Sequence, residues 1–236
     1  MDEKNLISFD SRGHLTQIDY AKRCVSSSNT IISMNTINCS VVFLNSFSSR
    51  LGNFIDTNIF IINKFICISG TGMFSDLKLI IKRARKDAMS FYYNFGEKIT
   101  VSLLTKKISF FIQEYTQKSG VRPFGVGINV IGSDENGISL YKISPGGAYS
   151  KNHFCAMGEN SNECLQFLKS RWNYNYNLGN CFDIGIRCLK ENSNIKLVSE
   201  NVQIAYITKN REIKILGKKN IENVIKKSEI YRRIDR

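Results

Sequence analysis

The hydrophobic positions of this chain follow two different spacings, and the two alternate in blocks along the sequence. Spacings of three and four residues predict helices, whereas short β-branched runs between turn residues predict strands. In order, the pattern predicts a helix, strands, two helices, strands, two helices, strands and a last helix. This block order favours an α+β fold with helices layered over antiparallel sheets, not a parallel βαβ fold.

Six segments carry the helical spacing. In the first, residues 14–27, the side chains expected to turn inward are Leu15, Ile18, Ala21 and Val25. The others are expected from near Ser75 to Gly96, from Thr100 to Tyr115, and over 161–172, 180–190 and 218–236. Ser75 and Thr100 are of the residue types that cap helix N-termini, and a glycine such as Gly96 commonly ends a helix.

The second helix has an apolar face and a basic face. Its inner face is expected to run from Leu77 to Tyr92, and the cluster over 82–86 (KRARK) lies opposite. Such a cluster could grip phosphates, but a solvated or subunit-facing surface is the favoured interpretation. The helix over 180–190 contains Gly185, which lowers its intrinsic propensity.

Strands are expected over 30–34, 41–44, 59–62, 65–69, 125–132, 138–143, 154–157, 202–208 and 213–216. No linker, repeat or low-complexity segment divides the chain, so residues 1–236 are expected to form one domain. Its parts are a tail and turn over 1–13, the helix over 14–27, a body over 28–217 and a basic C-terminal helix over 218–236.

Composition narrows the class of protein. A chain of 236 residues with 42% hydrophobic and 22% charged residues is typical of a globular protein and excludes a disordered or fibrous one. No apolar run suits a membrane helix and the N-terminus has no secretory signal, so we expect a soluble intracellular protein without a membrane partner. The net charge of +13 suggests nucleic acid as one candidate partner. That interpretation rests on charge alone, because the aromatic signature of an RNA-binding sheet is absent.

The residues offer little for metal or cofactor chemistry. The seven cysteines, at 24, 39, 67, 155, 164, 181 and 188, include no C-x-x-C pair and are expected to be reduced and mostly buried. There are only two histidines, and the segment 69–72 (SGTG) lacks the frame of a phosphate-binding loop. We therefore expect no metal and no cofactor.

Four segments, in order along the chain, carry a resemblance to a known family. Residues 9–21 (FDSRGHLTQIDYA), 113–126 (QEYTQKSGVRPFGV), 140–149 (LYKISPGGAY) and 156–160 (AMGEN) are similar to signatures of the α subunits of the 20S proteasome. The amino-acid sequence of the second segment is most similar to that of the α-2 type.

The resemblance implies an Ntn-hydrolase-like four-layer αββα sandwich, with the helix over 14–27 across its top. It implies a non-catalytic subunit of a threonine-type peptidase complex, active in ubiquitin-dependent protein degradation in cytoplasm and nucleus. Seven α subunits would form each outer ring, dock on rings of β subunits, bind regulatory caps or activators and gate the passage of substrates.

The resemblance also assigns roles to individual residues. The gate and activator-facing turn would comprise Ser11, Gly13, Gln17, Asp19 and Tyr20. The ring-packing motif would comprise Tyr115, Gln117, Gly120, Arg122, Pro123, Phe124 and Gly125. The sequence departs from the family in the N-terminal tail, where residues 2–4 lack the family's tyrosine, and in a shortened segment between residues 42 and 69. Two single positions differ as well. Ser11 replaces the proline of the turn, and counting back from Ser69 puts Asp56 where the family has a pocket lysine that pairs with an activator's terminal carboxylate. An anion there would repel that carboxylate.

An active β-type threonine peptidase is the remaining alternative, besides a nucleic-acid-binding module. Such an enzyme uses a threonine whose own amine is the base at a processed N-terminus. Thr30 lies near that position and Asn29 matches it more closely, but both follow the α-type helix. The sequence therefore favours the non-catalytic subunit.

Overall fold

The computed structural model describes residues 13, 15–45, 57–118, 120–192, 197–209 and 212–234. Its helices are α1 (Thr16–Ser26), α2 (Phe74–Phe95), α3 (Val101–Gln117), α4 (Ser161–Arg171), α5 (Leu178–Asn192) and α6 (Lys218–Ile234). Its strands are β1 (Ile31–Asn35), β2 (Cys39–Asn45), β3 (Ile59–Asn63), β4 (Ile66–Gly72), β5 (Val126–Asp134), β6 (Gly137–Ile143), β7 (Tyr149–Lys151), β8 (Phe154–Met157), β9 (Val202–Thr208) and β10 (Lys214–Ile215).

The strands form two antiparallel five-stranded sheets. One has the order β10-β9-β2-β1-β8 and the other the order β3-β4-β5-β6-β7. Each sheet combines strands from distant parts of the chain. In the first, Ile32 pairs with Phe43 of the next strand and with Ala156 of β8. The α+β class with antiparallel sheets is therefore confirmed.

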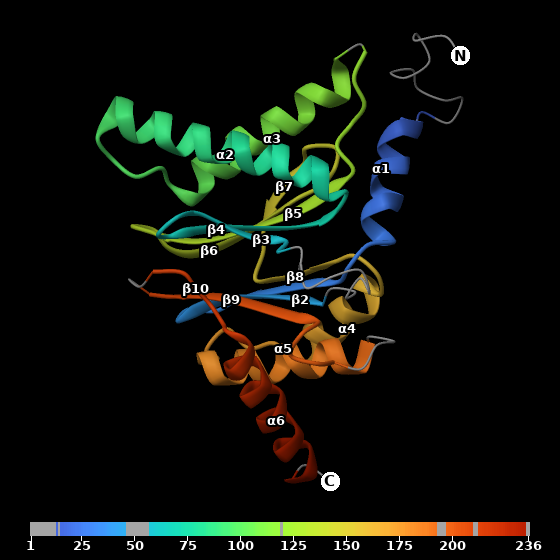
Figure 1. The fold of residues 1–236 in the computed structure, drawn as a ribbon, viewed down its shortest axis with the longest axis vertical. Coiled ribbons are helices and arrows are strands. Elements are labelled where there is room, and N and C mark those ends of the chain that lie inside the picture. Colours follow the sequence, from blue (N-terminus) through green and yellow to red (C-terminus); the bar gives the residue numbers. More distant parts are fainter. Residues whose placement is uncertain are drawn as a thin grey trace.

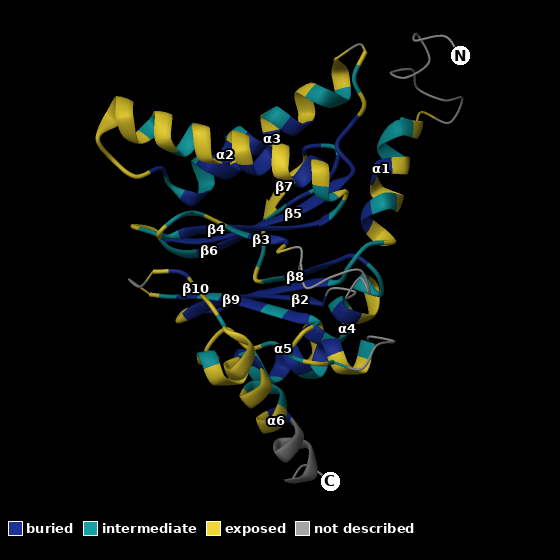
Figure 2. Ribbon diagram, viewed as in Figure 1, coloured by how far each residue is buried: buried dark blue, intermediate teal, exposed yellow. Residues whose placement is uncertain are grey.

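The sheets face each other, and helices cover their outer faces (Figure 1). Helices α2 and α3 lie over the sheet that contains β5, and α4, α5 and α6 lie over the sheet that contains β2. A buried cluster that includes Ile31, Leu44 and Ile131 fills the space between the sheets. Two further clusters join each sheet to its helices. Buried strands between half-exposed helices (Figure 2) are the pattern of a four-layer αββα sandwich, as expected.

The helices agree with the sequence pattern except at some ends. The Thr100 side chain caps α3 by accepting a hydrogen bond from the Leu103 N–H, and Gly96 ends α2 with a φ of 70°. The prediction for Ser75 is wrong, because α2 starts one residue earlier and Met73 occupies the N-cap position. Tyr92 is 59% exposed and does not belong to the inner face, since the last turn of α2 runs past the sheet.

Gly185 has a packing role that explains its place inside α5. A Cβ at this position would overlap the ring of Phe43 on β2, so the missing side chain lets the helix approach the sheet. Helix α5 is longer at both ends than the predicted segment 180–190. This close contact outweighs the helix propensity lost at a glycine, about 1 kcal/mol.

The strand predictions need two corrections. The last predicted strand, 213–216, is reduced to the two residues of β10. At its start the Ile213 N–H bonds to the Lys64 carbonyl instead of to β9, while the Leu216 N–H still bonds to the Ile204 carbonyl of β9. Strand β7 was not predicted, since its three residues are all exposed and show no alternation. In the part of the chain that the structure describes, no helix is long and apolar enough to cross a membrane.

Candidate functional site

Helix α1 closes one end of the sandwich. It stands beside the ends of the strands rather than over the face of a sheet (Figure 1). Ala21 and Val25 are buried, while Leu15 and Ile18 are partly buried. Glycines of β5 leave room for the helix. The Cβ position of Gly125 lies 3.3 Å from the Cys24 sulfur, and that of Gly127 lies 3.0 Å from a Val25 methyl group. The predicted inward-facing helix is confirmed.

The outer side of α1 carries the residues assigned to the gate and turn. Gln17 and Asp19 are partly buried, and the Asp19 carboxylate lies 3.2 Å from the Lys22 ammonium. The Tyr20 ring is 53% exposed, with the Arg23 guanidinium 6.0 Å from its centre. Gly13 has a φ of 78° in open space, which suits a turn. The structure thus places Gln17, Asp19 and Tyr20 on one helix.

Hydrogen bonds to distant parts of the chain hold the segment between α1 and β1. The Thr30 hydroxyl donates to the Glu159 carbonyl at 2.8 Å, and the Glu159 N–H donates to the Ser28 carbonyl at 2.9 Å. The Thr71 hydroxyl donates to the Asn29 carbonyl at 2.5 Å. Residues 28–30 are therefore fixed between β4 and the turn that follows β8.

The turn after β8 depends on Gly158. Its φ is 94°, a conformation that residues with a side chain rarely adopt, and a Cβ there would overlap the Asn29 carbonyl. Thr30, one of the two candidate nucleophiles, thus uses its hydroxyl in a structural bond, and its nitrogen is part of a peptide bond.

Arg122 organises the junction between α3 and β5. Its guanidinium makes two bonds, of 2.7 and 2.8 Å, to the two carboxylate oxygens of Asp76 at the start of α2. The same carboxylate accepts the Gly125 N–H at 3.1 Å. Asp76 is 3% exposed. The hydrogen bond to Asp76 also raises the pKa of Arg122, which favours the charged guanidinium.

The remaining residues of the ring-packing motif serve the same junction. The Phe124 ring is buried and lies 4.4 Å from the Tyr115 ring and 5.5 Å from the Phe111 ring, between centres. Pro123 is buried as well, and Gly120 adopts a φ of 77° in the turn. Gln117 is exposed at the end of α3. Within this chain Arg122, Phe124 and Gly125 join α2, α3 and β5. The ring-packing role that the resemblance implies for the motif stays a prediction.

Two assigned residues lie outside the described residues. These are Ser11 of the turn and Asp56 of the activator pocket. The roles that the resemblance implies for them stay predictions.

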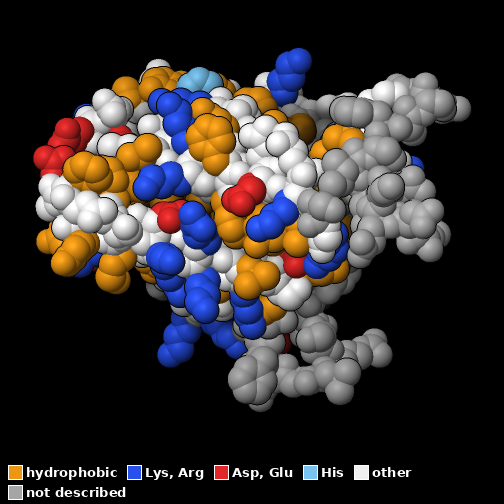
Figure 3. All heavy atoms as spheres, turned by 90° about the horizontal axis from the view of Figure 1, so that it is seen from above, with side chains coloured by type: hydrophobic (Ala, Val, Ile, Leu, Met, Phe, Trp, Pro, Cys, Tyr) orange, Lys and Arg blue, Asp and Glu red, His pale blue; other side chains and the backbone are white. Residues whose placement is uncertain are grey.

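The face formed by α2 and α3 is basic and partly apolar. Its exposed hydrophobic side chains include Met89, Tyr93, Phe95 and Phe110, at 66–88% exposure. The basic cluster over 82–86 is exposed except at Ala84, as predicted. Figure 3 shows basic and hydrophobic side chains intermingled over this face. Apolar side chains this exposed are typical of a surface that meets another protein.

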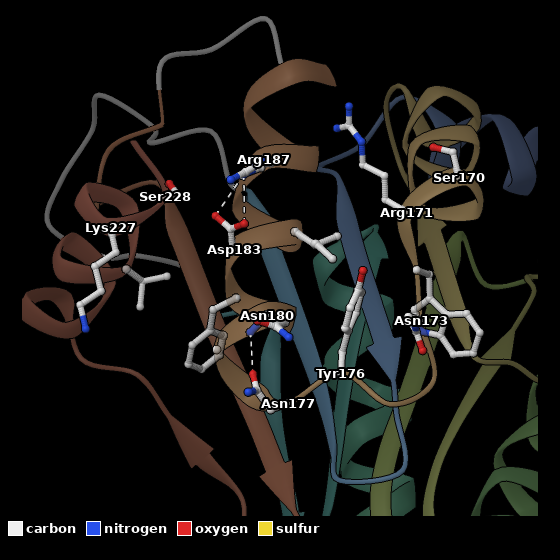
Figure 4. Close-up of a pocket in the computed structure, with 15 residues that line it drawn as sticks. Ser170, Arg171, Asn173, Tyr176, Asn177, Asn180, Asp183, Arg187, Lys227 and Ser228 are labelled. Carbon is white, nitrogen blue, oxygen red and sulfur yellow. Dashed lines mark hydrogen bonds and ion pairs between the residues drawn. The ribbon is translucent and has the colours of Figure 1, made fainter. Parts of the chain in front are cut away.

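A cavity of about 1150 Å³ lies on the opposite side, between α4, α5 and α6. Figure 4 shows Arg171, Asp183, Arg187 and Lys227 around it, from these three helices. Asp183 pairs with Arg187 at 3.0 Å. Within the described residues there is no cluster of His, Cys, Asp and Glu that could hold a metal ion.

Sequence reasoning missed Asp76 and this cavity. Asp76 could have been found as the only acidic residue in the first turn of α2, where a carboxylate is favoured by the helix dipole. The cavity had no comparable signal, because its lining comes from segments that are distant in the sequence.

Comparison with known proteins gives a consistent result. The family described as "Proteasome subunit" matches residues 25–207. The chain is 31% identical over 197 residues to proteasome subunit alpha type-2 of Dictyostelium discoideum, covering 82% of this chain and 84% of that protein. It is 33% identical over 192 residues to proteasome subunit alpha type-2 of Saccharomyces cerevisiae, covering 80% and 77%.

An archaeal relative extends the comparison. Proteasome subunit alpha of Pyrobaculum aerophilum is 27% identical over 192 residues, covering 79% of this chain and 78% of that protein. The family match runs from the end of α1 into β9, and the three relatives named above are α subunits. The chain therefore belongs to the proteasome subunit family and, within it, to the α type.

Proposed function

We propose that this chain is a non-catalytic subunit of the outer, seven-membered ring of a 20S proteasome. It would pack against other α subunits, dock on β subunits, bind regulatory caps or activators and help to control the passage of substrates. It would act in ubiquitin-dependent protein degradation in cytoplasm and nucleus. The observation that supports the non-catalytic role is α1, which occupies the end of the sandwich and leads directly into residues 28–30.

The two alternatives receive less support. A threonine peptidase needs a free α-amine on its nucleophile, and the nitrogens of Asn29 and Thr30 are both amides. A nucleic-acid-binding module would place its basic groups on a groove or a stacking surface. Here the exposed Lys and Arg side chains of α2 are interspersed with exposed apolar side chains such as Leu79 and Met89. This arrangement suits a protein partner better.

The substitution Thr30→Ala tests the non-catalytic role. We expect unchanged peptidase activity per assembled particle, because the hydroxyl is a structural donor, and a loss of about 1 kcal/mol in the stability of the chain. Activity is measured with fluorogenic peptides on particles purified through a tagged copy of this chain. A loss of one class of peptidase activity at unchanged particle yield would contradict the proposal.

The substitution Tyr93→Asp tests the α2 and α3 face as a subunit interface. Tyr93 is 88% exposed, so the free energy of unfolding should change by no more than about 0.5 kcal/mol. Removal of a well-packed aromatic side chain from an interface costs about 2 kcal/mol or more, and the yield of ring-sized particles should fall at least tenfold. Size-exclusion chromatography of co-expressed subunits measures it.

The control for this test is Ile37→Asp. Ile37 is 49% exposed in the turn between β1 and β2, on the other sheet, and we expect normal particle yield. Equal yields for Tyr93→Asp and the wild type would exclude this face as an interface.

Fluorescence microscopy of a tagged chain tests the proposed localisation.

Asp56 supports a further proposal, which rests on the sequence alone. An activator's terminal carboxylate would be repelled by Asp56, so the substitution Asp56→Lys should strengthen binding of an activator tail at least tenfold, and less at high salt. Binding of a labelled C-terminal activator peptide to the assembled particle measures this. The control is Asp56→Asn, which removes the repulsion without adding attraction and should give an intermediate affinity. Equal affinities for all three particles would contradict the proposal.

A further inference from the structure

Four of the seven cysteines form two thiol pairs, and each pair has one member on helix α5. The sulfurs of Cys39 on β2 and Cys181 on α5 are 3.8 Å apart. Two turns further along α5, the Cys188 thiol lies 3.7 Å from the Cys164 carbonyl oxygen of α4 and is hydrogen-bonded to the Cys164 side chain. Since Cys181 and Cys188 are seven residues apart, both lie on one side of α5. The sequence spacing gave no sign of these pairs.

The chemistry of each pair is asymmetric. In each, the S–H of one cysteine stabilises the thiolate of the other. The hydrogen bond with Cys181 lowers the pKa of Cys39, and that with Cys188 lowers the pKa of Cys164. The same bonds raise the pKa of Cys181 and of Cys188. The Thr36 hydroxyl, 3.4 Å from the Cys39 sulfur, adds a second partner for a thiolate there. Thiolates, not thiols, react with oxidants.

The pairs are buried but lie close to a route from solvent. Asn180, Ile184 and Arg187 of α5 line the cavity between the three helices (Figure 4), and Cys181 and Cys188 directly follow two of these residues. A small oxidant in the cavity is therefore separated from the thiols by little more than the side of one helix.

We propose that the two pairs are sites of reversible oxidation by hydrogen peroxide, in which Cys39 is joined to Cys181 and Cys164 to Cys188 as disulfides. The thiolate of Cys39 attacks one peroxide oxygen, the O–O bond breaks, and a sulfenic acid and hydroxide form. The sulfur of Cys181 then attacks the sulfenic sulfur, the S–S bond forms, the S–O bond breaks and water leaves. The two sulfurs together lose two electrons, which reduce one peroxide to two waters. Cys164 and Cys188 react in the same way.

The remaining cysteines serve as internal controls. Cys67 and Cys155 are also buried, but desolvation raises the pKa of each to about 12, and neither has a thiol neighbour within the described residues. Cys24 is partly exposed and single. An oxidation governed by solvent exposure alone would modify Cys24 first and would show no preference for the paired positions.

The test is cysteine mapping of the full chain after exposure to hydrogen peroxide. Free thiols are blocked with an alkylating reagent under denaturing conditions, and the digest is analysed by mass spectrometry. We expect cross-linked peptides for the two pairs as the major form, an intact mass lower by four hydrogen atoms, and full reversal by dithiothreitol. Cys67 and Cys155 should be alkylated in full.

Variants and a folding measurement make the result specific. Cys181→Ser should remove the link to Cys39 and keep the other, Cys188→Ser should do the reverse, and Cys24→Ser should keep both. Circular dichroism must show the native spectrum during oxidation. The proposal would be overturned if all four paired cysteines were alkylated after oxidation or if links joined other cysteines. Links that appear only after the native spectrum is lost would overturn it as well. Mapping of the wild-type chain decides this even if a variant does not fold.

Discussion

The substitution Gly158→Ala is expected to destabilise the chain by about 3–5 kcal/mol. The native φ of 94° would strain an alanine, at about 1–3 kcal/mol. The added methyl group would also overlap the Asn29 carbonyl, and relief of that overlap would separate the turn after β8 from the segment before β1. Overpacking of this kind typically costs about 1–3 kcal/mol. Urea denaturation followed by circular dichroism measures the change.

The control for this substitution is Gly137→Ala. Gly137 lies in the turn between β5 and β6 with a nearly identical φ of 97°, but no atom approaches its Cβ position. The strain alone should then cost about 1–2 kcal/mol. Equal losses for the two variants would show that the contact between Gly158 and Asn29 does not contribute.

The substitution Arg122→Ala is expected to cost about 2–3 kcal/mol of stability. It leaves the Asp76 carboxylate buried, with the Gly125 N–H still donating to it. Removal of one member of a fully buried ion pair costs about 3–5 kcal/mol. The expected loss is smaller here because the Arg122 side chain is 53% exposed. Denaturant titration at constant pH measures it.

The control is Arg83→Ala on the exposed face of α2. Arg83 pairs with Asp87 at 3.1 Å, and its side chain is 48% exposed. A pair within one helix at the surface contributes about 0.3–0.5 kcal/mol. If Arg122→Ala cost no more than Arg83→Ala, the α3–β5 junction would not depend on this pair.

The sequence pattern was sufficient for the layers of the fold because periodicity reports burial directly. Helix α3 shows this well, since Leu104, Ile108 and Ile112 repeat at helical spacing and are all fully buried. The pattern failed where a contact from elsewhere in the chain decided the local structure. Ser75 has the chemistry of an N-cap, yet α2 starts at Phe74. There the chain leaves β4 at Gly72, and the Met73 N–H bonds to the Gly125 carbonyl.

The candidate site was predictable only in part, for the same reason. The Arg122 motif stood out as a segment, but its partner Asp76 is 46 residues away. Arg122, Phe124 and Gly125 make contacts inside the subunit, and the ring-packing role of the motif stays a prediction. The thiol pairs and the helix-lined cavity arise from tertiary contacts between α4, α5, α6 and β2, which no local spacing encodes.

The bond between Thr30 and Glu159 has a consequence for biosynthesis. It joins residues 129 positions apart, and β1 pairs on one side with β8. On a ribosome, α1 and β1 emerge long before β8 and the Gly158 turn exist. The start of the chain cannot complete its closure until most of the protein has been made, and such long-range contacts fold slowly. Residues 28–30 lack their partner turn during that interval, and the apolar side of α1 stays uncovered until β5 has emerged, so a newly made chain is most open to chaperones at its N-terminal end.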